Sequence, residues 1–240
     1  MAHHGLRALF SVAVALAVGA INLSAQALIT TGSFETGTSP PGNMNYTTHL
    51  AGSTDITGWT VISTPAPALA PLAWLNGDLS GVVNNAFKAS DGTFFLDLTG
   101  FSDDASTFGG VQQSFATTNG QLYQAKFDLI TGNGNSIGPV GATLTVGPAS
   151  QTFTTSATPS LATTYTLNFT ANSTSTTLSI LGASTPLGGW FLGVDNVAVT
   201  AIPEPAECAG FAGLIVLAAA VYVRHRSRRG RSTGVALFTR

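Results

Sequence analysis

The 240-residue sequence has few charged residues, which make up 8% of it, and it contains a single cysteine. Soluble domains usually carry about a quarter charged residues, so this chain must stay in solution through uncharged polar groups. One cysteine excludes a disulfide scaffold, and the scarcity of charge argues against a cytoplasmic helical enzyme. The hydrophobic fraction of 44% is nevertheless sufficient for a core, which excludes a disordered chain.

Positive charge is almost absent from the middle of the chain. Only Lys88 and Lys126 lie between residues 28 and 202, against nine acidic residues, which gives this part a net charge of −7. Such a surface repels the phosphate backbone of a nucleic acid and favours basic partners or metal cations. We therefore expect no nucleic-acid binding.

Residues 1–27 are predicted to be a secretory signal peptide. Arg7 precedes an uninterrupted apolar run over residues 8–20, and Ala25-Gln26-Ala27 supplies the small residues that a signal peptidase requires. The alternative, a retained membrane anchor, is disfavoured because the run is shorter than the roughly 20 residues that span a bilayer.

The C-terminal segment is predicted to contain a second targeting signal. Pro203-Glu204-Pro205 is followed by an apolar segment, residues 208–223, and by a basic tail, residues 224–240. We predict that the apolar segment is a single transmembrane helix, although it falls short of the roughly 20 residues that normally cross a bilayer. By the positive-inside rule the arginines of the tail stay cytoplasmic, which holds residues 28–202 outside.

This tripartite C-terminal pattern resembles the PEP-CTERM sorting signal of Gram-negative bacteria. The resemblance implies transient anchoring in the inner membrane, processing by an exosortase and delivery to the cell surface or the extracellular space. One departure is the tail, because residues 230–240 continue beyond the point where such signals usually end.

Alternation of apolar and polar residues predicts β-strands throughout the middle of the chain. Residues 94–98, 123–129, 166–170 and 177–180 each alternate in this way, which gives every strand one buried and one solvated face. Asn119-Gly120 predicts a tight hairpin turn between the strands on either side of it. Roughly nine short strands joined by polar turns favour an all-β, antiparallel two-sheet sandwich.

Six segments share their order and spacing with a known family: Leu28–Glu35, Ile56–Trp59, Gly92–Leu98, Gly110–Phe115, Phe127–Leu129 and Gly193–Val197. They resemble the choice-of-anchor C group of bacterial proteins and the related domain of unknown function 642. Thr31 is a minor departure, because the family more often has Asn there. The resemblance implies a galactose-binding-like jelly roll, the fold of many carbohydrate-binding modules, and binding rather than catalysis. It names no ligand, since a fold does not fix a function.

Two acidic residues, Glu35 and Asp195, are flanked by apolar residues that would be buried in a strand. A carboxylate in such a place is costly unless it is paired, and no Lys or Arg is near either residue in the sequence. One hypothesis is a structural calcium ion, for which the resemblance also implies these two residues as ligands. The alternative hypothesis is that both carboxylates cap turns by accepting hydrogen bonds from backbone N–H groups.

Two tryptophans and an acidic doublet are candidate ligand-binding residues. Trp74 and Trp190 lie near loops, where an indole ring could stack on a sugar, and packing under a loop is the alternative for both. Asp103 and Asp104 are adjacent carboxylates that could contact a sugar hydroxyl or a cation, or belong to a solvated loop. Trp59, which enters a strand, is expected in the core.

A catalytic site is poorly supported by the sequence. Residues 28–202 contain no cysteine nucleophile, no Gly-x-Ser-x-Gly motif and no His-Glu-x-x-His motif. A Ser-His-Asp triad would have to use His49, for which the sequence identifies no base-orienting partner. We therefore expect a protein that is not an enzyme.

Three functions follow, in order of preference. The first is an exported, surface-anchored and non-catalytic module that binds extracellular or cell-wall polysaccharide. The second is a structural component of an extracellular matrix or biofilm, which associates with copies of itself through uncharged strand edges. A polysaccharide hydrolase on the same scaffold is the third.

Overall fold

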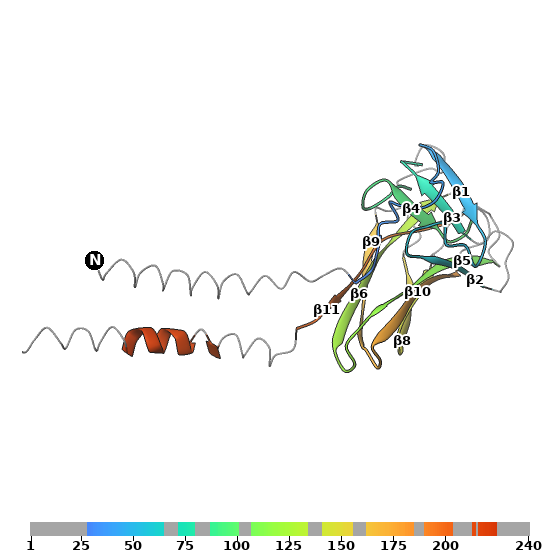
Figure 1. Cartoon of the computed structure of the whole chain (residues 1–240). Helices are drawn as coiled ribbons and strands as arrows, with labels where there is room; N and C mark the ends of the chain where they lie inside the picture. The colour runs from blue at the N-terminus through green and yellow to red at the C-terminus, as the bar shows by residue number, and fades with distance from the viewer. Residues whose placement is uncertain are drawn as a thin grey trace, which may run out of the picture. The chain divides into compact units, whose positions relative to one another are not determined.

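The computed structural model of the protein describes residues 28–64, 72–79, 87–100, 107–133, 141–155, 162–184, 190–203, 213–214 and 216–224. Residues Gln26–Ile202 form one compact unit that is separate from the rest of the chain. Figure 1 shows that this unit is built from β-strands. The strands are β1 (Asn45–His49), β2 (Thr60–Thr64), β3 (Leu72–Asn76), β4 (Phe94–Asp97), β5 (Phe108–Ala116), β6 (Leu122–Asn133), β7 (Gly141–Val146), β8 (Ala149–Thr154), β9 (Thr163–Thr170), β10 (Ser175–Ser184) and β11 (Trp190–Ala201).

The strands form two sheets. One has six strands in the order β1-β3-β4-β11-β6-β9, and the other has five in the order β2-β5-β10-β7-β8. Every strand pair in both sheets is antiparallel. The prediction of an all-β, antiparallel two-sheet sandwich is confirmed, with eleven described strands where the sequence indicated roughly nine.

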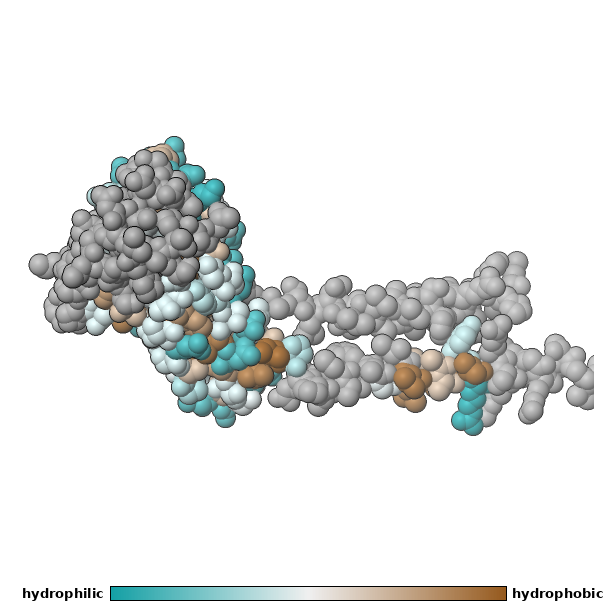
Figure 2. Space-filling view, turned by 180° about the vertical axis from the view of Figure 1, so that it is seen from behind, coloured by the Kyte–Doolittle hydropathy of each residue, from teal (hydrophilic) through white to brown (hydrophobic). Residues whose placement is uncertain are grey.

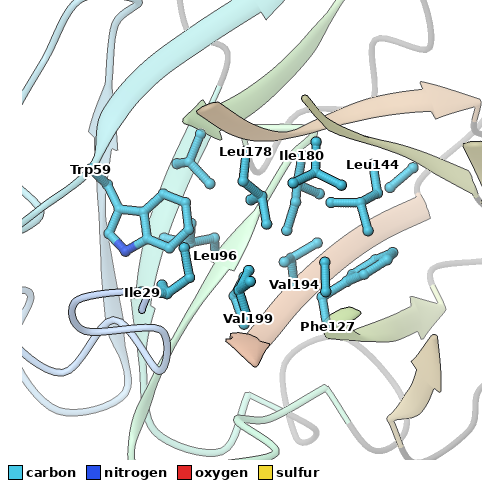
Figure 3. Close-up of a cluster of buried hydrophobic side chains, with 14 of the residues drawn as sticks. Ile29, Trp59, Leu96, Phe127, Leu144, Leu178, Ile180, Val194 and Val199 are labelled. Carbon is cyan, nitrogen blue, oxygen red and sulfur yellow. The ribbon is translucent and has the colours of Figure 1, made fainter. Parts of the chain in front are cut away.

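The main core lies between the two sheets, as the close-up in Figure 3 shows. Each buried Val, Leu, Ile or Phe side chain there stabilises the fold by about 1.5 to 3 kcal/mol relative to an exposed one. All described strands and both hydrophobic clusters lie within Gln26–Ile202, so this unit has the core needed to fold on its own. The labelled side chains come from both sheets and from the N-terminal segment: Ile29, Trp59, Leu96, Phe127, Leu144, Leu178, Ile180, Val194 and Val199.

The hairpin predicted at Asn119-Gly120 is not a hairpin. Residues 119–120 do form a turn, and Gly120 has a φ of 85°. The strands on either side, β5 and β6, nevertheless belong to different sheets, because β5 pairs with β2 and β10 whereas β6 pairs with β11 and β9. A turn signal shows where the chain reverses, and the pairing partner is decided by which apolar faces meet in the core.

Strand β4 is buried on both faces, which the alternating pattern did not predict. Phe95 and Asp97, expected on a solvated face, are 0% exposed. The side of the six-stranded sheet that faces away from the main core carries a second hydrophobic cluster, in which Phe87 packs on Phe95 with ring centroids 4.9 Å apart. A Cβ atom at Gly132 would lie 2.7 Å from the Phe87 ring, and one at Gly193 would lie 3.1 Å from it. The absence of a side chain at these two positions therefore leaves room for the ring against the sheet.

In the other part of the chain, residues 213–214 and 216–224 are helical. None of the helices that the structure describes is long and apolar enough to cross a membrane. The predicted signal peptide, residues 1–27, and Glu204 and Pro205 of the predicted sorting motif lie outside the described residues.

Candidate functional site

Glu35 holds the chain at the beginning of β4. Its Oε1 atom accepts hydrogen bonds from the backbone N–H groups of Thr93 and Phe94, each at 2.7 Å. The residue before it, Phe34, has a φ of 58° and is fully buried, so the turn sets the ring in the core next to a carboxylate that stays near the surface of the sheet. Glu35 therefore acts as a cap for backbone N–H groups.

Asp195 holds the same segment a few residues earlier. Its Oδ2 atom accepts hydrogen bonds from the N–H groups of Ser90 and Asp91 at 2.8 and 2.9 Å. The two predicted acids thus converge on one stretch, residues 90–94, although they lie far apart in the sequence. Both use the backbone contacts that the capping hypothesis describes.

An irregularity in β11 positions Asp195. Asn196 has a φ of 52°, and the pairing register with β6 shifts between Asp195 and Ala198. The Asn196 N–H group donates to Asp195 Oδ1 at 2.7 Å, and Lys126 Nζ donates to Asn196 Oδ1 at 3.3 Å. The extra residue of such a bulge returns Val197 to the core while Asp195 stays on the opposite side of the sheet.

Asp128, which the sequence did not single out, lies directly opposite Asp195 on β6. Like charges in this position repel, and donors between them offset the repulsion. Ser90 Oγ is 2.7 Å from Asp128 Oδ2 and 3.2 Å from Asp195 Oδ2, and its one proton serves one carboxylate at a time. Asn196 Nδ2 donates to Asp128 Oδ2 at 3.0 Å, and Thr164 Oγ1 donates to Asp128 Oδ1 at 2.5 Å.

Burial raises the pKa of Asp195 to about 7, and hydrogen bonds from Asp91, Asn196 and Ser90 oppose the rise. Asp195 is 0% exposed, so its ionised form loses hydration that the donors replace only in part. This carboxyl group therefore titrates near neutral pH. Its protonated form does not repel Asp128.

The donor set around these acids does not fit a calcium ion well. Asp195 accepts hydrogen bonds from three backbone N–H groups and shares the Ser90 Oγ–H donor with Asp128, and a cation would have to displace or compete with these donors. The residues that the structure describes include no cluster of three or more His, Cys, Asp or Glu side chains that could hold a metal. Calcium at Glu35 and Asp195 stays a prediction, and these contacts favour the capping alternative.

The two tryptophans predicted as sugar platforms have different outcomes. Trp74 is 0% exposed, and its Nε1 donates to the Phe34 carbonyl oxygen at 3.1 Å, so the prediction of a ligand-stacking role is wrong for this residue. Its strand carries it into the core between the sheets, where it packs on Phe94. The backbone of Trp190 pairs with Asn133, and its side chain lies outside the described part of the structure.

The remaining predictions concern the acidic doublet, Asp103 and Asp104, and the core residue Trp59. Asp103 and Asp104 lie outside the described residues. Trp59 is 2% exposed and donates from Nε1 to the Thr31 carbonyl oxygen at 3.0 Å, which confirms its place in the core.

The structure gives His49 the orienting partner that its sequence context did not identify. His49 Nδ1 lies 3.2 Å from Asp55 Oδ2, and His49 Nε2 lies 3.0 Å from Thr47 Oγ1, so hydroxyl, imidazole and carboxylate stand in the order of a catalytic triad. The imidazole is only 7% exposed, and Ser53 Oγ also donates to Asp55 Oδ2 at 2.9 Å. A substrate has little access to this histidine, and we assign the cluster to holding the turn that follows β1.

The five-stranded sheet differs from these acidic surroundings because it contains no ionisable acid or base. None of its five strands includes Asp, Glu, Lys, Arg or His. On β7, the buried residues Ala142, Leu144 and Val146 alternate with Thr143 and Thr145, which therefore point away from the core. The outer face of this sheet, which we call the neutral face, is uncharged throughout the strands.

Polar side chains cross the neutral face in a continuous row. The strand registers place Thr60 of β2 opposite Gln112, Gln112 opposite Ser179, Ser179 opposite Thr145, and Thr145 opposite Ser150 of β8. Adjacent strands lie about 4.8 Å apart, so the row extends for roughly 19 Å. Each member presents hydroxyl or amide groups that both donate and accept hydrogen bonds.

Neighbouring hydroxyl groups on the neutral face are also bonded to one another. The Oγ1 atoms of Thr143 and Thr152 are 2.8 Å apart, and Thr145 Oγ1 is 2.9 Å from Ser150 Oγ. On the other side of the sheet's centre, Ser114 Oγ is 2.8 Å from Thr177 Oγ1. The described surface of the sandwich drawn in Figure 2 is mostly in the pale colours of intermediate hydropathy, which are those of Thr and Ser.

Comparison with known proteins identifies the family. The model of the family described as "Protein of unknown function (DUF642)" matches residues 27–199. The chain belongs to the DUF642 family. This confirms that part of the resemblance, and the matched range spans the sandwich of this DUF642 protein.

Solved structures similar to this DUF642 chain include carbohydrate-binding modules. The structure of TmCBM61 in complex with β-1,4-galactotriose is 12% identical, has a TM-score of 0.48, and matches 74% of this chain and 99% of its own. A family 16 carbohydrate-binding module is 13% identical, with a TM-score of 0.39 and coverage of 72% and 99%. No curated protein matches the sequence. Identities this low establish nothing about a shared ligand.

A larger enzyme is among the similar structures as well. It is the xylanase 10B of Clostridium thermocellum, comprising its CBM22-1 and GH10 modules, complexed with xylohexaose. It is 17% identical, has a TM-score of 0.38, and the match covers 68% of this chain and 29% of that chain.

Proposed function

We propose that this DUF642 protein is a non-catalytic binding module for neutral extracellular or cell-wall polysaccharide. The observation that supports the proposal is the neutral face, with its row of Thr60, Gln112, Ser179, Thr145 and Ser150. A polysaccharide presents many hydroxyl groups along an extended chain, and a row of hydroxyl and amide groups matches them as both donor and acceptor.

Charge favours a neutral glycan over an acidic one. Residues 28–202 have a net charge of −7, and the neutral face contributes none of it. An anionic polymer would be repelled by the domain as a whole, and on this face it would find no Lys or Arg in any strand to pair with. A neutral glycan is not repelled by the domain and needs no cationic partner, because binding it removes no ion from water.

The proposal extends to where the module is displayed. The N-terminal segment, residues 1–27, would direct export as a signal peptide, and Pro203-Glu204-Pro205 with the apolar and basic segments after it would direct PEP-CTERM sorting by an exosortase. The module would then stand at the surface of a Gram-negative cell or in the surrounding matrix. Detection of the protein in surface and medium fractions, lost when Pro203-Glu204-Pro205 is replaced by alanines, tests this part.

A hydrolase on this scaffold is not favoured. The one imidazole in the described strands, that of His49, is nearly closed off by the groups that bind it. The acids Asp128 and Asp195 are both buried and satisfied by donors. We therefore propose binding without turnover.

The test is a pull-down of residues 26–202 with insoluble neutral polysaccharides (cellulose, galactan and mannan) and, in parallel, with the acidic polymers polygalacturonate and alginate. We expect one or more neutral polymers to retain the protein and the acidic polymers to leave it in solution. Thr145→Asp places a charge in the centre of the row and should abolish retention, because the carboxylate must be desolvated without a partner.

Thr200→Asp on β11 is the matched control, because Thr200 is a half-buried threonine on the outer side of the other sheet. It adds the same charge and should leave retention unchanged. Equal loss in both variants, or retention by acidic polymers alone, would contradict the proposal.

A further inference from the structure

The strand β9 is an open edge of the six-stranded sheet. It stands last in the strand order, next to β6, and its eight residues pair with β6 without any shift in register. A strand in this position presents a row of N–H and C=O groups to its open side, and natural proteins usually protect such an edge. The protective devices are charged side chains, proline, bulges, very short strands or a covering loop.

Strand β9 has none of the devices that its own sequence could supply. Its residues, TTYTLNFT, include no charge and no proline. The edges β1 and β2 are shorter, with five residues each. The turn before β2 covers that strand as well, because Val61 N–H donates to the Ser53 carbonyl at 2.9 Å and Gly52 N–H donates to the Val61 carbonyl at 2.8 Å.

The core side of β9 is incompletely buried. Tyr165 and Leu167 face the core and pack against it, yet both remain half-exposed, whereas Phe169 on the same face is 3% exposed. Removing apolar surface from water is favourable, and an unpaired strand edge is a template for pairing with another strand. A second strand paired with β9 would therefore satisfy its open edge and also cover its half-exposed apolar side chains.

The sequence of β9 complements itself in antiparallel pairing. When Leu167 lies opposite Leu167 of a second copy, Tyr165 lies opposite Phe169 on the core side. On the outer side, Thr166 then lies opposite Asn168, a pair that can form a hydrogen bond. No pair in this register contains a charge, so the association brings no like charges together at the joined edge.

We propose that two copies of this chain associate by pairing their β9 strands antiparallel about Leu167, which joins the two six-stranded sheets into one. The partner is a second copy because the β9 edge of one copy and its side chains are complementary to the β9 edge of another copy. The inference does not rest on glycan binding, since the neutral face belongs to the other sheet. Pairing through β9 leaves both neutral faces of the pair free.

Cysteine cross-linking tests the register. The chain's one native cysteine, Cys208, lies outside residues 26–202, so a cysteine introduced into this unit has no partner within its own chain. Opposite Cα atoms of antiparallel strands lie about 4.5 to 5.5 Å apart, within the range that a disulfide bridges. Leu167→Cys should therefore form a disulfide-linked dimer on mild oxidation, whereas Thr166→Cys, which faces Asn168 of the other copy, should stay monomeric.

Both cysteine variants are first checked for a cooperative thermal transition. A folded Leu167→Cys protein that remains monomeric under oxidation would overturn the proposal. A cross-link formed by Thr166→Cys and not by Leu167→Cys would overturn the register about Leu167.

Sedimentation velocity tests the association itself. For residues 26–202 we expect the mass to double as concentration rises. Thr166→Lys combined with Asn168→Lys places lysines opposite one another at the joined edge and should leave only monomer. Because residue 166 also lies opposite Lys126 of β6 within the same chain, this variant must first show a cooperative unfolding transition. Thr177→Lys combined with Ser179→Lys, on the central strand β10 of the neutral face, adds the same charge and should leave the dimer intact.

The two pairs of lysine variants separate this inference from the proposed function. The β9 variant should lose dimerisation and keep glycan retention, and the β10 variant should do the reverse. A wild-type unit that stays monomeric at all concentrations, or a dimer that survives lysines in β9, would refute pairing through this edge.

Discussion

The two sheets of this sandwich share a core but differ in chemistry. Every charged side chain found in a strand belongs to the six-stranded sheet, on β4, β6 and β11, whereas the five-stranded sheet has none. The charges on the six-stranded sheet are engaged inside the protein: Asp195 and Asp128 are buried and bind the chain segment that crosses the sheet. The hydroxyl groups on the neutral face are exposed or half-exposed.

This difference separates the polar groups that hold the protein's own chain from those that we propose for ligand binding. A buried carboxylate satisfied by backbone N–H groups fixes the protein's own chain and has little left for a ligand. A row of exposed and half-exposed Thr, Ser and Gln side chains offers hydroxyl and amide groups to a ligand and carries no charge to desolvate. We therefore assign stability to the six-stranded sheet's polar groups and recognition to those of the five-stranded sheet.

The largest expected effect comes from Trp74 in the six-stranded sheet. Trp74→Ala should lower the free energy of unfolding by about 3 to 5 kcal/mol, because it removes a fully buried ring and the bond from its Nε1 to Phe34. Urea unfolding followed by tryptophan fluorescence measures the loss. A stable variant that has lost only its glycan retention would show that Trp74 serves the ligand after all.

The second effect is a dependence of stability on pH that comes from Asp195. Its pKa is raised to about 7 in the folded protein, so the stabilisation is present below the ordinary pKa near 4 and is lost as pH rises toward 7. Between pH 5 and pH 8 the free energy of unfolding should fall by roughly 2 to 3 kcal/mol more for the wild type than for Asp195→Asn. Parallel curves for the two proteins would contradict the assignment.

A smaller effect is expected at Glu35. Glu35→Gln keeps an oxygen that accepts the N–H groups of Thr93 and Phe94 but loses the charge that strengthens these bonds, so the unfolding free energy should fall by about 1 kcal/mol. Chemical denaturation measures the change. No loss of stability would mean that the carboxylate does not hold the start of β4.

Calcium should have the smallest effect. Because the donors around Asp195 are already N–H and O–H groups, we expect the melting temperature to change by less than about 1 °C between excess calcium and a chelator. A rise of several degrees with calcium would show that the carboxylates exchange these donors for a cation. The prediction of a calcium site would then be supported over capping.

Local sequence pattern was sufficient to predict the sandwich. Tyr123, Ala125, Phe127 and Leu129 alternate with polar residues, and all four are buried as the pattern requires. The alternating pattern wrongly predicted exposed side chains at Phe95 and Asp97. It contains no information about a distant segment that covers the outer side of the sheet with Phe87. It failed at Asn119-Gly120 for a related reason, since a turn does not specify which sheet the next strand joins.

The candidate site was predicted only in part. Glu35 and Asp195 were found because a carboxylate between apolar residues requires a partner, and the structure supplies one segment that serves both. Asp128 could not be predicted as part of the site, because its position opposite Asp195 depends on the order and register of the strands. The neutral face could not be recognised from the sequence, because its strands are separated along the chain by the charged strands β4 and β6, and their common sheet becomes visible only in the fold.

The most direct test of the account is the salt dependence of glycan affinity. The dissociation constant of residues 26–202 for a neutral polysaccharide that retains them should be unchanged between low and high salt, because no ion on the neutral face takes part in binding. Isothermal titration calorimetry with a soluble oligosaccharide of that polymer measures it. A tenfold or greater loss of affinity at high salt would show that charged side chains carry the recognition, and it would contradict the division of roles between the two sheets.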